Sequence, residues 1–435
     1  CHQAEADAWS SSQHRHAMAL ASPSSGLGDF GNATLTYNRV TSTFSRRGDD
    51  FIVNTDGPDG VLTDYRVSYT FGLYPLQQYL IEFPDGRLQA LSLAWDARPR
   101  DEGGARWFHL YADDAVDFRD ELHWTKRPHN WNFMCADCHS TNVRKGYDAD
   151  TDRFRTTWSE ISVGCEACHG PASRHVRWAT TSSWLRPVLW SDNGLTARLT
   201  ERRGVTWTTN STTGRPMRSE PRTTAREIEV CAPCHSRRVQ VREGHAAGDR
   251  LANAYAVETL APGLYFPDGQ QRDEVYTYGS FAQSKMHAAG VTCADCHDPH
   301  SSRLRAPGNA LCGQCHASPA YDTPAHHHHS GAPGSPQTAC VSCHMPSTTY
   351  MTVDPRRDHS LRVPRPDLSV TLGVPNPCTG CHGTQTLAWA ADAVRRWYGR
   401  DAAGFQTFAP AFAAHERAEP AGTGAVADVA NDSSQ

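Results

Sequence analysis

The 435-residue sequence lacks any run of 18 apolar residues, so it contains no predicted membrane-spanning helix. It also lacks the basic excess of nucleic-acid-binding proteins, because 42 Lys and Arg are accompanied by 47 Asp and Glu and the formal net charge is −5. Only 38% of the residues are hydrophobic, although the chain is long enough for two or three domains. The absence of a signal peptide is expected for a processed or truncated chain.

Cysteine, in contrast, is abundant and regularly spaced. Seven Cys-x-x-Cys-His units use 14 of the 15 cysteines. This spacing attaches a c-type haem through two thioethers and ligates its iron through the histidine. Cys1 is followed by His2, so the chain is expected to begin inside an eighth unit, giving seven or eight haems. The complete units are Cys135/Cys138/His139, Cys165/Cys168/His169, Cys231/Cys234/His235, Cys293/Cys296/His297, Cys312/Cys315/His316, Cys340/Cys343/His344 and Cys378/Cys381/His382.

Three other uses of these cysteines fit the pattern less well. Structural zinc sites combine Cys pairs into sets of four ligands and need no histidine directly after every second cysteine. Disulfides suit small secreted scaffolds, and a two-residue gap within every pair is poor framework spacing. A thioredoxin-like pair occurs once, near a βαβ pattern. For Cys1 alone, a mature lipoprotein terminus is the competing interpretation.

The predicted fold is mainly α-helical and irregular polypeptide wrapped around a stacked haem core, with a small antiparallel β-domain inserted near the N-terminus. Buried macrocycles supply apolar volume that the side chains do not, so folding is expected to depend on haem attachment. The predicted divisions are an N-terminal haem segment over 1–29, a β-rich domain over 30–125, a multihaem domain over 126–383, and C-terminal helices with a flexible tail over 384–435.

The β-rich domain is predicted from a region without cysteine in which the hydrophobic period becomes two. Tyr65, Val67 and Tyr69 alternate with polar residues, and the stretch 79–83 alternates before the turn Pro84-Asp85-Gly86. This domain is interpreted as either a docking surface or a scaffold.

Helices are predicted beyond the last unit. Residues 387–398 read as a helix that Gly399 terminates, and a second helical piece over 405–416 is interrupted by Pro410. The Ala-, Gly-, Asp- and Ser-rich end is expected to be a disordered tail or the start of a longer region. Residues 180–225 are predicted to form a long surface excursion.

The 23 histidines are numerous enough to give every iron two axial ligands. Eight follow an attachment cysteine and are the predicted proximal ligands: His2, His139, His169, His235, His297, His316, His344 and His382. Methionine ligation at Met134, Met286 or Met345 is the less favoured choice. The best candidates for distal ligands are His175, His287, His300 and His359, followed by His123 or His129, one or two of His326 to His329 (His327 and His328 are the preferred pair), and His14 or His16 (His16 is preferred).

The chain resembles bacterial octahaem c-type cytochromes, which often continue into tetratricopeptide or similar helical repeats. The resemblance is carried by residues 131–142, which include Cys135, Cys138 and His139, by residues 165–171, and by residues 284–300. It implies that Cys1-His2 is the second half of a first unit and that the C-terminal helices correspond to the start of the repeats. More distantly, the pattern is similar to the multihaem nitrite reductases and hydroxylamine oxidoreductase, in which haems stack in parallel and perpendicular pairs.

The leading hypothesis is a bacterial periplasmic or extracellular electron carrier with mostly bis-histidine haems. It is favoured over an enzyme, although enzymatic activity stays open. Its expected partners are donor and acceptor proteins, or identical subunits in a filament. The alternative is an oxidoreductase acting on a small nitrogen or sulfur compound at one open haem. Nitrite reductases typically mark that haem by a lysine in place of the attachment histidine, and all seven complete units here end in histidine. The Cys231/Cys234/His235 unit is the candidate open site, because its near neighbour is His245. A third hypothesis is a redox-sensing scaffold.

Overall fold

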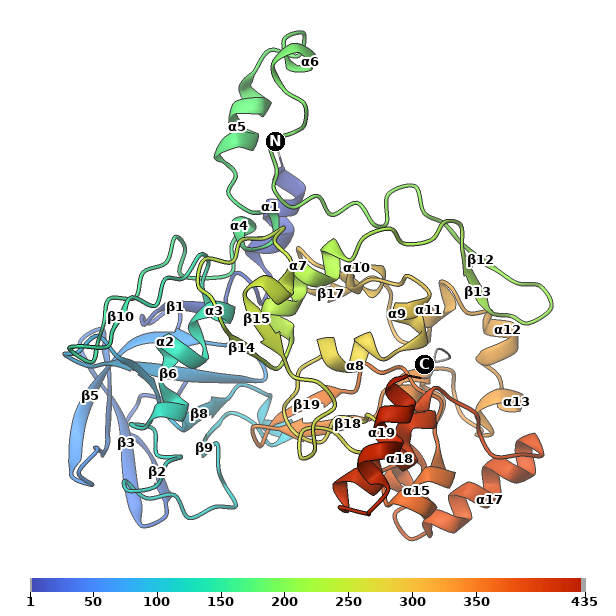
Figure 1. Ribbon diagram of the computed structural model, residues 1–435. Helices are drawn as coiled ribbons and strands as arrows, with labels where there is room; N and C mark the ends of the chain where they lie inside the picture. The colour runs from blue at the N-terminus through green and yellow to red at the C-terminus, as the bar shows by residue number, and fades with distance from the viewer. Residues whose placement is uncertain (1, 432–435) are drawn as a thin grey trace.

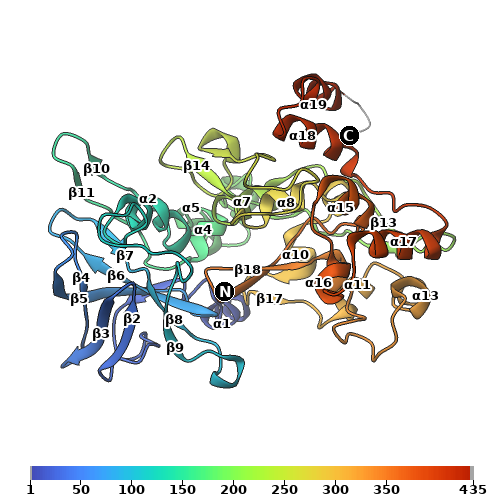
Figure 2. The same cartoon turned by 90° about the horizontal axis from the view of Figure 1, so that it is seen from below.

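The computed structural model describes residues 2–431. An antiparallel sheet lies at one end of the molecule, and the C-terminal helices lie at the other (Figure 1). Figure 2 shows that most of the segments with Cys-x-x-Cys-His units lie between these two parts. Helices α5 (Ser173–Thr180) and α6 (Arg186–Leu189) project from this middle region as an arm (Figure 1). No helix among the described residues could cross a membrane.

The predicted antiparallel β-domain near the N-terminus is confirmed. Its strands run in the order β2-β3-β4-β5-β6-β8-β9, with β1 on β5 and β7 on β6. The sheet includes β1, which comes from the segment assigned in the sequence to the N-terminal haem region. The strands are β1 Met18–Leu20, β2 Ala33–Tyr37, β3 Val40–Arg47, β4 Asp50–Asp56, β5 Leu62–Phe71, β6 Leu76–Glu82, β7 Leu88–Ala90, β8 Leu93–Asp96 and β9 Arg106–His109.

Aromatic side chains fill the core on one face of this sheet. Phe44 and Trp107 stack with ring centroids 3.6 Å apart, and both are buried. Phe30 stacks on Phe51 at 4.3 Å in the same cluster. Because aromatic side chains bury large areas, this cluster gives the domain a core that needs no haem. The turn before β7 requires glycine: Gly86 has φ +83°, and a Cβ there would lie 2.2 Å from the carbonyl oxygen of Phe154.

A second cluster joins the sheet to the first complete Cys-x-x-Cys-His unit. Met18, Phe71 and Leu80 of the sheet pack with Trp131 and Ala136. Helix α2 (Trp131–Met134) begins at Asn130, whose side-chain oxygen accepts from the Phe133 N–H at 3.1 Å. The unit is thus fixed against the sheet rather than held by a loop.

Between the sheet and the C-terminal helices the elements are short. The buried clusters in this region are small, as expected where haem would fill the interior. The helices are α1 Gln3–Ser10, α3 Ala136–His139, α4 Cys165–His169, α7 Arg226–His235, α8 Tyr278–Ala282, α9 Lys285–Ala288, α10 Cys293–Cys296, α11 Asn309–Gly313, α12 Ser318–Tyr321, α13 Pro324–His327 and α14 Cys340–His344, with 3-10 turns η1 Arg100–Glu102, η2 Arg127–His129 and η3 Leu251–Asn253.

Five two-stranded hairpins connect these helices. One hairpin lies within the predicted surface excursion over 180–225, which therefore contains regular secondary structure. It pairs β12 (Trp207–Thr209) with β13 (Pro216–Arg218). The others are β10 Tyr147–Asp148 with β11 Arg153–Phe154, β14 Arg238–Gln240 with β15 Tyr255–Val257, β16 His297–Asp298 with β17 Arg303–Leu304, and β18 Ser347–Tyr350 with β19 Asp354–Arg357.

The C-terminal region contains α15 (Pro366–Leu372), α16 (Pro377–Cys381), α17 (Leu387–Tyr398), η4 (Gln406–Phe408), α18 (Ala409–Glu416) and α19 (Gly422–Ala430). Helix α17 and its stop at Gly399 agree with the sequence prediction. Pro410 lies in the first turn of α18. A backbone N–H at that position would have no acceptor within the helix, so proline is tolerated there. The predicted flexible tail is helical over α19, because Gly422 allows a close approach to the main chain of His415. Residues 432–435 lie outside the described part.

Candidate haem-binding sites

Each complete Cys-x-x-Cys-His unit lies in or beside one turn of helix. The spacing therefore places both thiols on one side of the turn, with the histidine next to them. Local signals start these helices: Thr292 and Asp295 form a capping box at α10, and the Asn376 side chain accepts from the Thr379 N–H at 3.1 Å at α16. No disulfide joins any two of the fourteen described cysteines. We number the units 1 to 8 in chain order; Cys1 of unit 1 lies outside the described residues.

Six of the eight attachment histidines face a second histidine from a distant segment. The distances between ring centroids are 5.9 Å for His2 and His175, 6.4 Å for His235 and His14, 6.3 Å for His169 and His300, 6.4 Å for His297 and His359, 6.0 Å for His344 and His326, and 6.0 Å for His382 and His329.

This spacing fits an iron between the two rings. Metal–imidazole bonds are about 2 Å long, so imidazoles on opposite sides of one ion have centroids about 6 Å apart. A direct contact between histidine rings would be shorter, as in the stack of His109 on Tyr37 at 3.6 Å. The residues present therefore fit haem at these six units.

Main-chain carbonyls orient several of these rings. Because a carbonyl oxygen only accepts, the facing Nδ1 carries the hydrogen and Nε2 keeps its lone pair for a metal. Nδ1 of His344 donates to the Arg362 oxygen at 2.8 Å, and Nδ1 of His139 donates to the Ala17 oxygen at 2.8 Å. Nδ1 of His175 donates to the Asn193 oxygen at 2.7 Å, and Nδ1 of His359 donates to the Arg357 oxygen at 2.8 Å.

Unit 4 differs from its expected environment. The sequence analysis named it as the open site with His245 nearby, but the ring opposite His235 is that of His14. His245 instead packs against Tyr255 at 5.2 Å. Burial lowers the pKa of His235 to about 4, which keeps its imidazole neutral and able to bind a metal.

Units 2 and 6 are the ones without an opposed imidazole. Among the described residues, no histidine ring faces His139 or His316 at a distance comparable to the six pairs. His139 instead meets the ring of Phe71 at 5.3 Å, and His316 meets that of Tyr321 at 5.7 Å.

Two other predicted ligands lie in the β-domain or pack against it. His129 Nδ1 donates to the Ala90 oxygen at 3.0 Å, so its Nε2 accepts from the Tyr111 hydroxyl at 3.3 Å. His123 Nε2 lies 3.3 Å from Oδ2 of Asp56. Neither ring is among those that face an attachment histidine.

The remaining predicted ligands are placed by other contacts. His287 Nε2 accepts from Arg222 Nη2 at 3.0 Å. His328 stacks on Trp397 at 4.1 Å, and His327 Nδ1 accepts from the His329 N–H at 3.2 Å. His16 is exposed.

In these clusters the structure places His14, His326 and His329 opposite attachment histidines, rather than the preferred His16, His327 and His328. Each of the first three had been named only as an alternative, and no local signal separates one member of such a cluster from the next. Which histidine of a cluster lies opposite an attachment histidine is visible only in the folded structure, where both rings are placed.

Neighbouring units approach each other through their cysteines. Cys138 Sγ of unit 2 lies 3.9 Å from the main-chain oxygen of Cys234 in unit 4. Cys231 of unit 4 interacts with Cys293 of unit 5, and Cys312 of unit 6 interacts with Cys340 of unit 7.

Longer-range electrostatic interactions between cysteines and histidines place the remaining units relative to one another. Cys296 of unit 5 lies near Cys315 of unit 6, and Cys343 of unit 7 lies near Cys381 of unit 8. Cys168 of unit 3 lies near unit 4, and His169 of unit 3 lies near His2. The units thus follow the order 1-3-4-5-6-7-8, with unit 2 beside unit 4.

Known proteins resemble this chain in two segments of sequence and in fold. Residues 286–321 match the family model of the doubled CXXCH motif, and residues 111–170 match that of cytochrome c554 and c-prime. The fold is similar to the crystal structure of the outer cell wall cytochrome OcwA, at a TM-score of 0.54 and 17% identity over 92% of this chain and 85% of that one. No curated protein sequence matches the chain.

The attachment motifs and these family matches define a protein that binds haem c. With seven complete units in one chain, it is a multihaem c-type cytochrome.

Proposed function

We propose that the protein is an exported octahaem electron carrier, in which seven complete units and the unit ending at Cys1-His2 each hold one haem. The observation that carries this proposal is the set of six opposed histidine pairs. Two axial imidazoles leave an iron no open position, so such a haem exchanges electrons without binding a substrate. The protein tunes each potential through ligand orientation, burial and local charge.

The order of the units supports a path through the molecule. Units 1 and 8 stand at the ends of the series, and the contact of Cys138 with the main chain at Cys234 makes unit 2 a side branch at unit 4. Electrons entering at one end would reach the other through units 3 to 7. Redox proteins or identical subunits at the ends are the proposed partners, outside the cytoplasm.

Low-temperature EPR of the oxidised protein, with optical spectra of the reduced protein before and after carbon monoxide, tests the proposal. At least six haems should be low-spin, and no more than two should bind carbon monoxide. Carbon monoxide binding to more than two haems would refute the proposed pairs.

A second candidate function rests on units 2 and 6, which lack an opposed imidazole among the described residues. A haem with one protein ligand could bind a small nitrogen or sulfur compound. Nitrite and hydroxylamine titrations followed by EPR distinguish the two functions. A stoichiometric high-spin signal that both compounds abolish would favour the oxidoreductase, and an unchanged spectrum would favour the carrier.

A further inference from the structure

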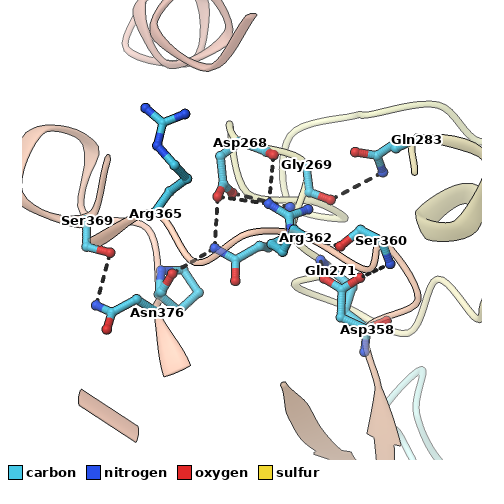
Figure 3. Close-up of polar contacts among 12 residues, drawn as sticks. Asp268, Gly269, Gln271, Gln283, Asp358, Ser360, Arg362, Arg365, Ser369 and Asn376 are labelled. Carbon is cyan, nitrogen blue, oxygen red and sulfur yellow. Dashed lines mark hydrogen bonds and ion pairs between the residues drawn. The ribbon is translucent and has the colours of Figure 1, made fainter. Parts of the chain in front are cut away.

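A buried ion pair between Asp268 and Arg362 holds the segment 358–362 in place (Figure 3). Only 3% of the Arg362 side chain and 1% of the Asp268 side chain are exposed. Nη1 of Arg362 lies 3.1 Å from Oδ2 of Asp268 and donates to its main-chain oxygen at 3.0 Å, while Nε donates to Ser360 Oγ at 2.8 Å. A buried guanidinium needs such partners, because loss of the Asp268 carboxylate would leave an uncompensated charge and loss of a neutral acceptor would leave an unsatisfied N–H.

The carboxylate of Asp268 is itself anchored on both sides. Its Oδ1 accepts from the Gln270 N–H at 3.2 Å, and its Oδ2 accepts from Gln270 Nε2 at 2.9 Å. The same Gln270 amide donates to the Pro375 oxygen at 2.7 Å. The ion pair therefore ties segment 358–362 to the turn at Asp268, and Gln270 links that turn to the main chain at Pro375.

The first histidine that depends on this segment is His344 of unit 7. Nδ1 of His344 donates to the Arg362 oxygen at 2.8 Å, and the Arg362 N–H donates to the His344 oxygen at 3.2 Å. The two residues thus bond reciprocally, so displacement of Arg362 would turn or release the His344 imidazole, which faces His326.

The second is His359, which faces His297 of unit 5 and lies in the same segment. The residues on either side of it are buried and bonded: Oδ1 of Asp358 accepts from the Ser360 N–H at 2.8 Å, and Oδ2 accepts from the Gln271 N–H at 3.2 Å. Figure 3 shows these contacts converging with those of Arg362.

We propose that Arg362 is a positioning residue for the haems of units 5 and 7, acting through His359 and His344. The proposal rests on the proposed electron-carrier function. A hydrogen bond at Nδ1 raises the basicity of an axial imidazole and so favours the oxidised iron. Loss of the Arg362 contacts should therefore raise the midpoint potential of unit 7 and alter the EPR signals of units 5 and 7.

The test uses the full haem-loaded chain with Arg362→Gln and Arg362→Lys. Lysine keeps the charge but cannot reach Asp268 and Ser360 together as the guanidinium does. The matched control is Arg365→Gln, because Arg365 pairs with Asp367 at 2.6 Å in the same region and neither residue bonds to a haem-facing histidine. Both Arg362 variants should shift two low-spin signals, and the control should shift none.

His359→Ala and His326→Ala identify the signals of units 5 and 7, since each variant should convert one low-spin haem to a form that binds carbon monoxide. Shifts in those two signals alone would support the positioning role. Shifts in neither signal, or an Arg362→Lys spectrum identical to that of the unsubstituted protein, would overturn it. If His359→Ala and His326→Ala leave every low-spin signal intact, the failure lies in the proposed ligand pairs.

Ser360→Ala is the second variant for this test, used if the Arg362 variants do not accumulate with full haem. It removes only the acceptor of Arg362 Nε. A smaller shift of the same two signals would support the proposal, and an unchanged spectrum would count against it.

Discussion

His14 lies opposite His235, with 6.4 Å between ring centroids, although one residue comes from the N-terminal segment and the other from α7. His14 is held there by a contact of its Nδ1 with the Pro299 oxygen at 3.3 Å. Three separate segments therefore build one candidate haem site, and the N-terminal residues close the site at the centre of the series of units.

Replacement of His14 by alanine should open unit 4. The iron there would lose its proposed second imidazole, so one additional haem should become high-spin in EPR and bind carbon monoxide. His16→Ala is the matched control, because His16 is exposed and only two residues away. Equal carbon monoxide binding by the two variants would contradict the assignment.

Replacement of Cys312 and Cys315 by alanine should remove one haem. Both thioethers of unit 6 would be lost, so the haem-to-protein ratio from pyridine haemochrome spectra and intact mass should fall by one. Met345→Leu, a change beside unit 7, should leave the ratio unchanged. An unchanged ratio in the double cysteine variant would show that unit 6 carries no haem.

The stability of the β-domain should fall as the pH falls from 6.5 to 4. Burial lowers the pKa of both His109 and His129 to about 4, whereas an unfolded histidine has a pKa of about 6.5. The unfolded state then binds more protons in this window, so each residue costs up to about 3 kcal/mol of stability on acidification.

Guanidinium unfolding followed by far-UV circular dichroism at pH 7, 6 and 5 measures this effect. His109→Gln should flatten the dependence, and His16→Gln should not. A midpoint independent of pH in the unsubstituted protein would contradict the burial argument.

Alanine at Gly86 should destabilise the protein more than alanine at Gly103. Both glycines have positive φ, +83° and +81°, so each substitution incurs a similar backbone cost of about 1 kcal/mol. A Cβ at position 86 would also lie 2.2 Å from the Phe154 oxygen, whereas one at position 103 meets nothing within 4 Å. Thermal unfolding should show a lower Tm for Gly86→Ala, and equal Tm values would argue against the clash.

The attachment units, α17 and the β-domain could be predicted because their signals are local. Five consecutive residues specify each thioether pair with its histidine, and alternation along 79–83 specifies a strand. The helical end of the chain was not predicted, because α19 depends on packing against α18 through Gly422.

Sequence alone predicted the attachment units, since the two cysteines and the histidine of each unit belong to one turn of helix. Tertiary structure decided which histidine lies opposite. A histidine that faces an attachment histidine comes from another segment, as His14, His326 and His329 do here. Neighbours such as His16 and His328 have the same chemistry, and only the folded chain separates them.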